Sequence, residues 1–163
     1  MRPALIGCLL LVVTAFSGSP SPSVDPPDGL VGTWRIVSYA DYPATGPTAY
    51  PYSRHPIGTL IYDASGHMAV QITEDPTTPA AIAAAHDAPG RPSGAYTAYF
   101  GTYTVDWTTH VITHIVEGNL YPAHVGTSHL RPFELDGDRL ILRPRWEQDG
   151  VPYEGVRVFE RLR

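Results

Sequence analysis

The sequence predicts an all-β fold: an eight-stranded antiparallel up-and-down barrel. A Gly-Thr-Trp motif at residues 32–34 opens the first of eight strand-like segments, and Asp- and Gly-rich turns separate several neighbouring segments. The last segment brings Arg161 near the C-terminus, where it would lie over Trp34 if the first and last strands pair. Eight such strands close into a barrel that is wide enough for one small ligand.

The expected strands are rich in β-branched and aromatic residues and are bounded by turn-forming residues, as strands in all-β proteins are. We expect turns at residues 63–66, 106–109, 136–137 and 149–150. The predicted strands are residues 30–39, 57–62, 67–73, 96–105, 110–117, 129–135, 139–146 and 155–162.

A long insert at residues 74–95 interrupts this pattern. Its alanine-rich stretch at residues 79–86 predicts a short helix, which ends near Pro89 and Gly90. An insert of this length is long enough to act as a lid or a plug of the barrel. A surface loop with one or two helical turns is an equally good interpretation.

The N-terminal residues predict export. Arg2 precedes a mostly apolar run and then small and Pro-rich residues, which is the layout of a secretory signal peptide at residues 1–17. Residues 18–27 then form a flexible tether and residues 28–163 one domain, secreted or periplasmic and free of the membrane after leader cleavage. Cys8 ends a lipobox-like sequence but lies inside the apolar run, so lipidation is disfavoured.

Composition excludes several mechanisms. The only cysteine is Cys8, so the mature domain has no disulfide and no thiol nucleophile. All 11 basic residues are arginine, which excludes Schiff-base chemistry and anchoring of pyridoxal phosphate. A formal net charge of −5 argues against nucleic acid and anionic lipid as partners. We expect no cofactor, and the oligomeric state stays open.

Four tracts spread over the chain resemble the bacterial and fungal lipocalin-like domain family. The four tracts are residues 32–34, 58–68, 98–103 and 111–118 running into 125–127. Residues 131–140 extend the last of them. The resemblance implies a small calycin-type barrel, found in secreted bacterial proteins and in fungal relatives that act on polyketide-like molecules. Ile115 and Pro132 depart from the family pattern, which often has a second histidine and a polar residue there.

Strand parity predicts which side chains meet inside the barrel, because alternate residues share one face. We expect polar tips from three strands to face inward in otherwise apolar company, the composition of a ligand cavity with a few orienting groups. A filled core, in which these tips bond to one another and His114 is structural, stays open. The predicted ligand-binding residues are Tyr62, Tyr99, Tyr103, His114, Arg131 and Phe133.

Gly32, Trp34 and Arg161 are interpreted as a structural signature, with the arginine stacked on the indole by a cation–π contact. No metal site is predicted. His110 and His114 are four residues apart, which on a strand is about 13 Å, too far for one ion. His124 and His129 lie in or beside a loop, and a fortuitous or regulatory metal site there stays open.

Three functions remain. The first is a binder of a small, largely apolar or aromatic molecule, which the barrel, the aromatic strands and the missing nucleophiles favour. The second is a cofactor-independent cyclase, isomerase or dehydratase with His114 as acid or base and Arg131 near a developing oxyanion. The third is a filled barrel that acts as an interaction module through the 74–95 insert. We expect binding rather than catalysis.

Overall fold

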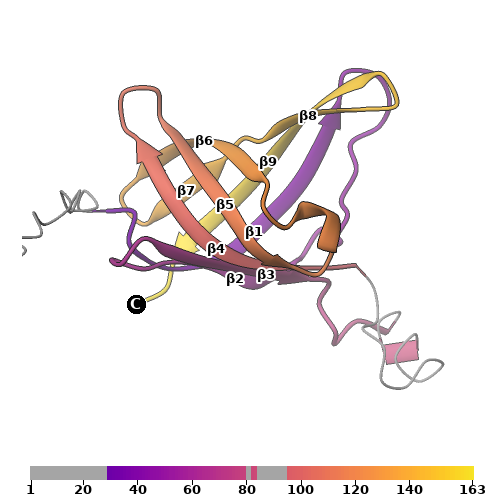
Figure 1. Ribbon diagram of the computed structural model, residues 1–163. Helices are drawn as coiled ribbons and strands as arrows, with labels where there is room; N and C mark the ends of the chain where they lie inside the picture. Colours follow the sequence, from indigo (N-terminus) through magenta and orange to yellow (C-terminus); the bar gives the residue numbers. More distant parts are fainter. Residues whose placement is uncertain (1–28, 80–81, 84–94) are drawn as a thin grey trace, which may run out of the picture.

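The computed structural model describes residues 29–79, 82–83 and 95–163 and confirms the predicted all-β barrel. Eight antiparallel strands form a closed barrel, and one extra strand, β8, lies at its rim (Figure 1). The strands are β1 (Gly32–Pro43), β2 (Ile57–Tyr62), β3 (His67–Thr73), β4 (Tyr96–Asp106), β5 (Val111–Asn119), β6 (Ser128–Asp136), β7 (Arg139–Leu142), β8 (Arg145–Gln148) and β9 (Val151–Arg161). A 3₁₀ turn, η1 (Pro122–His124), precedes β6.

Pairing of β1 with β9 closes the barrel, and it places Trp34 opposite Arg161. Most of the other strands pair with their neighbours in sequence, so the up-and-down order is the predicted one. The hairpin between β8 and β9 turns at Asp149 and Gly150, which both have positive φ angles, the conformation that short hairpin turns favour.

The single strand predicted at residues 139–146 is divided into β7 and β8. Both pieces pair with β9 in one continuous register, from Arg139 opposite Glu160 to Gln148 opposite Val151. Pro144 lies between them and has no backbone N–H to donate to a ladder, which explains the interruption. Its carbonyl still accepts a hydrogen bond from the Gly155 amide at 2.8 Å.

The short helix predicted at residues 79–86 lies mostly outside the described residues, as do the signal peptide, the tether and most of the 74–95 insert. In its described part, the amide of Ile82 donates to the carbonyl of Thr78 at 3.0 Å, the i to i−4 bond of a helical turn. None of the helices in the described part of the chain is long and apolar enough to span a membrane.

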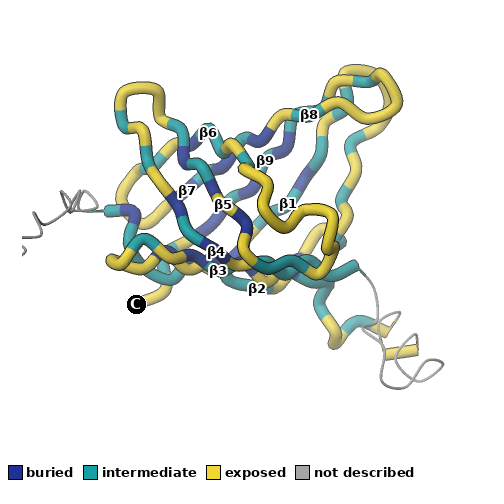
Figure 2. The backbone as a smooth tube through the Cα atoms, viewed as in Figure 1, coloured by how far each residue is buried: buried dark blue, intermediate teal, exposed yellow. Residues whose placement is uncertain are grey.

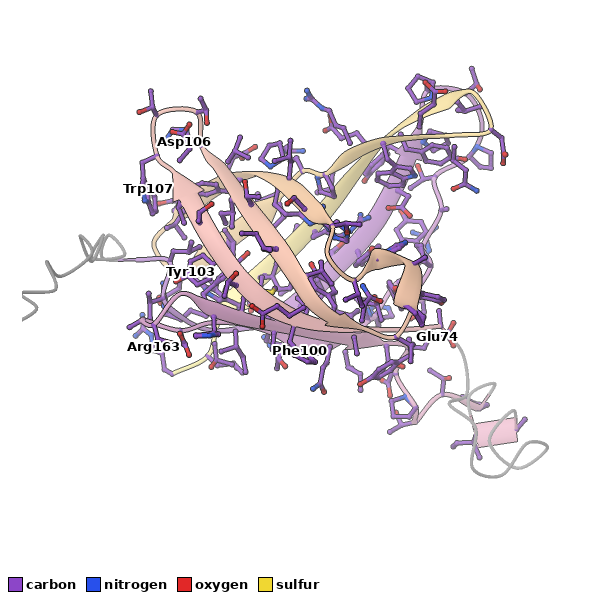
Figure 3. The ribbon with its side chains drawn as sticks, viewed as in Figure 1. Glu74, Phe100, Tyr103, Asp106, Trp107 and Arg163 are labelled. Atoms are coloured by element: carbon purple, nitrogen blue, oxygen red, sulfur yellow. The ribbon has the colours of Figure 1, made fainter. Side chains whose placement is uncertain are left out.

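The barrel has two different ends. We call the end that holds Trp34, Tyr103 and Arg161 the closed end, and the end that holds Tyr99 and Trp146 the open end. Figure 2 shows buried backbone running along the strands and exposed hairpin tips. In Figure 3, Tyr103, Trp107 and Arg163 lie on one side of the molecule and Glu74, which follows β3, lies on the other.

Candidate functional site

The closed end is filled by side chains whose polar tips bond to the chain itself. Trp34 is fully buried and its Nε1 donates to the carbonyl of Leu30 at 2.9 Å. The guanidinium of Arg161 lies 4.1 Å from the centre of the Trp34 ring and donates to the carbonyls of Val31 and Gly29. These contacts seal the barrel beneath its core.

Gly32 is required by the same arrangement. A Cβ atom at this position would meet Nη1 of Arg161 at 2.5 Å, and the φ angle of +147° is one that other residues rarely adopt. The predicted signature of Gly32, Trp34 and Arg161 therefore lies together in space as one packing unit.

The open end contains a cavity of about 660 Å³. Its volume lies within the range of roughly 300–1,000 Å³ that is typical of sites for small ligands. Apolar walls come from several strands, with five Phe, Tyr or Trp side chains among the lining residues. The aliphatic part consists of Val70, Ile72 and Leu142, and the aromatic part of Tyr39, Tyr99, Tyr121, Trp146 and Phe159.

The predicted site residues divide between this cavity and the core beneath it. Tyr99 and Arg131 line the cavity. The other four do not contact it: Tyr62, Tyr103, His114 and Phe133 are all buried. Strand parity gave the inward face but not the depth of each side chain along the barrel axis.

His114 joins the core to the cavity. It is fully buried, with Nε2 at 2.6 Å from the hydroxyl of Tyr62 and Nδ1 at 2.9 Å from the hydroxyl of Tyr99. Desolvation by burial, followed by the nearby charge of Arg131, places the pKa of His114 well below its ordinary value. The imidazole is therefore neutral at physiological pH and carries one ring hydrogen.

Tyr62, Tyr103 and Phe133 are engaged within the protein. The ring of Tyr62 packs against that of Tyr103 at 4.7 Å between centroids, and burial raises the pKa of Tyr62 well above its ordinary value. Tyr103 donates its hydroxyl hydrogen to the carbonyl of Asp63 at 2.9 Å. Phe133 packs edge-on against Trp107 at 5.2 Å between ring centroids.

His129 lies in the cavity wall between Tyr99 and Arg131. Its ring centroid is 5.8 Å from that of Tyr99, and Nη2 of Arg131 lies 3.1 Å from its Nδ1. Because a guanidinium can only donate, Nδ1 of His129 accepts this hydrogen bond and Nε2 carries the ring hydrogen. Nε2 then donates to Thr127 Oγ1 at 3.1 Å. Burial and then the charge of Arg131 lower the pKa of His129 to about 4, so this ring is also neutral near pH 7.

Sequence reasoning missed the opposite wall, which is built around Arg157. This side chain is only 6 % exposed, its Nη2 lies 2.6 Å from Asp41 Oδ1, and its guanidinium lies 3.4 Å from the centre of the Tyr39 ring. The ion pair is close but is not aligned as a hydrogen bond.

Gly155 makes room for this arrangement. A Cβ atom there would lie 2.6 Å from both terminal nitrogens of Arg157. A glycine two residues before an arginine on one strand face is the sequence signal that would have drawn attention to this wall.

The site offers little for a metal. Within the part of the chain that the structure describes, no group of three or more His, Cys, Asp or Glu side chains is placed to hold an ion. His124 and His129 do approach each other, with 5.6 Å between ring centroids, but His129 already uses both nitrogens as described above.

Comparisons with known proteins identify the fold family. Neither the comparison with curated proteins nor the comparison with solved structures gave a match. The sequence model of a family described as the lipocalin-like domain matches residues 31–162, which covers the whole barrel. The chain therefore belongs to the lipocalin-like domain family.

Proposed function

We propose that this protein binds one small, largely apolar or aromatic molecule in the open end of its barrel. The observation that carries the proposal is the cavity of about 660 Å³, whose walls combine aliphatic side chains with five Phe, Tyr or Trp rings. Apolar walls with a few placed polar groups are the composition expected of a small-molecule site.

The two alternatives have less support. An acid–base role for His114 would require it to reach a substrate, but it is fully buried and tyrosine hydroxyls contact both of its nitrogens. A barrel that serves only as an interaction module would be expected to have a filled core, whereas this one has space at the open end.

Binding of a neutral aromatic probe tests the proposal. N-phenyl-1-naphthylamine fluoresces strongly in apolar surroundings, so titration of the full chain should give a saturable signal with one site. The Thr97→Trp variant places a bulky ring in the cavity wall, because Thr97 lines the cavity and pairs with the buried Ile72. It should weaken binding at least about tenfold, which is about 1.4 kcal/mol. Thr104→Trp, an exposed position of β4 outside the cavity, is the matched control and should bind as wild type.

Absence of saturable binding, or equal binding by Thr97→Trp, would overturn the proposal. If the probe does bind, mass spectrometry of small molecules extracted from the purified protein should identify the natural ligand.

We also propose that binding takes place outside the cytoplasm, as a secreted or periplasmic protein. The supporting observation is the layout of residues 1–17, an apolar run that leads into small and Pro-rich residues. N-terminal sequencing of the exported protein should find a start between residues 16 and 24, and a lipid on Cys8 would contradict a free protein.

A further inference from the structure

Hydrogen bonds within the protein decide which atoms of Tyr99, His129 and Arg131 can donate hydrogens to a ligand. The first of these hydrogen bonds lies in the core. The hydroxyl of Tyr62 has His114 Nε2 as its hydrogen-bond partner among the described residues. A buried donor left without a partner costs about 1–3 kcal/mol, so the Tyr62 hydroxyl donates its hydrogen to Nε2.

This donation decides the tautomer of His114. A neutral imidazole has one N–H, and since Nε2 accepts, the hydrogen is on Nδ1. Nδ1 therefore donates to the oxygen of Tyr99 at 2.9 Å. The hydrogen of the Tyr99 hydroxyl is left uncommitted, and Tyr99 lines the cavity.

Arg131 adds further donors beside Tyr99. Its Nη1 donates to the carbonyl of Leu130 at 3.0 Å and its Nη2 to His129, which leaves three of its five N–H groups without a partner among the described residues. No carboxylate of the described residues lies within ion-pair distance of Arg131, whereas Arg157 has Asp41 and Arg145 has Glu154. Arg131 thus brings an uncompensated positive charge to the cavity wall.

His129 supplies no acceptor to balance these donors. Its Nδ1 accepts from Arg131 and its Nε2 donates to Thr127, whose hydroxyl in turn donates to the carbonyl of His124 at 2.7 Å. The wall therefore presents hydrogens and positive charge to whatever occupies the cavity. Charge-assisted hydrogen bonds of this kind are the strong ones, and arginine suits a planar oxyanion.

We propose that the ligand of this cavity carries an acidic oxygen, as in an aromatic carboxylate or an ionised phenol or enol, and presents it to Tyr99 and Arg131. The inference rests on the proposed function, because it names the chemical class of the molecule that the cavity binds. The apolar and aromatic walls hold the remainder of the ligand.

A matched pair of probes tests this class. 8-Anilinonaphthalene-1-sulfonate has the same two aromatic groups as N-phenyl-1-naphthylamine and differs by one anionic group. The full chain should bind the sulfonate with a Kd at least about tenfold lower than that of the neutral probe, which is about 1.4 kcal/mol.

Variants assign the preference to the wall. Arg131→Gln should weaken binding of the sulfonate about tenfold and change the Kd of the neutral probe by less than about twofold. Arg139→Gln removes the same charge from an exposed position of β7 and is the control for long-range attraction. Tyr99→Phe removes the hydroxyl alone, should also weaken the sulfonate selectively, and carries the test if Arg131→Gln does not fold.

The outcomes separate the two proposals. If neither probe binds the wild-type chain, the proposed function fails. If the neutral probe binds but the sulfonate binds no more tightly, the acidic-ligand inference is overturned while the binding function stands. Equal losses in Arg131→Gln and Arg139→Gln would also overturn it, because the preference would then reflect net charge alone.

Discussion

The two ends of the barrel use the same kinds of residue for opposite purposes. At the closed end, Arg161 lies over Trp34, donates hydrogens to backbone carbonyls and forms an ion pair with Asp138. At the open end, Arg131 has a neutral histidine and one carbonyl as partners and retains donors that face the cavity. The partners of an arginine, rather than its presence, decide whether it seals a barrel or is free to meet a ligand.

Arg157 is the intermediate case. It lines the cavity as Arg131 does, but it stacks on Tyr39, pairs with Asp41 and donates to the carbonyl of Ala40 at 2.5 Å. Its charge is balanced inside the protein. The positive charge of the cavity therefore comes mainly from the wall formed by Tyr99, His129 and Arg131.

The largest expected effect is at the closed end. Trp34→Ala removes a fully buried indole and should lower the free energy of unfolding by about 3–5 kcal/mol, as for other buried large-to-small changes. Urea denaturation measures it. Trp146→Ala, at the open end, should cost clearly less and should instead weaken binding of N-phenyl-1-naphthylamine, because Trp146 is partly exposed and lines the cavity.

A loss below about 1 kcal/mol for Trp34→Ala would mean that the closed end does not depend on this indole. The interpretation of the closed end as the part that stabilises the fold would then be wrong.

The connection between the core and the cavity should show a smaller effect. His114→Phe keeps an aromatic ring but leaves the Tyr62 hydroxyl buried without a partner, which should cost about 1–3 kcal/mol of stability. The double variant with Tyr62→Phe should recover part of this loss, because both polar partners are then gone. Chemical denaturation of His114→Phe, Tyr62→Phe and the double variant gives the coupling energy. Strict additivity would show that the His114 ring and the Tyr62 hydroxyl do not interact.

The dependence of stability on pH should be smaller again. The folded-state pKa of His129 is about 4 and that of His114 is also lowered, so below about pH 6.5 the unfolded chain binds more protons than the folded one. This contribution to stability is complete above pH 6.5 and is lost as the pH falls towards 4. The slope is at most about 1.4 kcal/mol per pH unit for each histidine.

Denaturation midpoints between pH 8 and pH 4.5 measure this slope, which should be reduced in His129→Gln. A free energy of unfolding that rises on acidification through this range would show that the pKa values of these histidines are raised, not lowered, in the folded state.

The sequence allowed much of the fold to be predicted, because strands and turns are local features. Turn residues such as Asp149 and Gly150 mark the hairpins, and the Gly-Thr-Trp opening marks the first strand. The division of the seventh strand also has a local cause in Pro144, although it was not predicted.

The candidate site was harder to predict from the sequence, because alternation along a strand shows which face a side chain lies on but not its depth along the barrel axis. Tyr99 and Tyr103 share one face of β4, yet Tyr99 lines the cavity while Tyr103 bonds to the Asp63 carbonyl near the closed end. The wall around Arg157 depends on pairing between strands at opposite ends of the chain. Such depth and pairing follow from barrel closure, which a single sequence does not display.

The direction of the hydrogen-bond chain through His114 decides whether Tyr99 has a hydrogen for a ligand, and the ring nitrogens of His114 report that direction. ¹⁵N NMR of the full chain labelled at histidine distinguishes the protonated from the unprotonated nitrogen. We expect a neutral ring at pH 7 with the hydrogen on Nδ1, so that Tyr99 keeps its own hydrogen for a ligand. A hydrogen on Nε2 would reverse the chain and turn the hydrogen of Tyr99 towards Nδ1, and a charged ring would contradict the neutral state; either result would contradict the account.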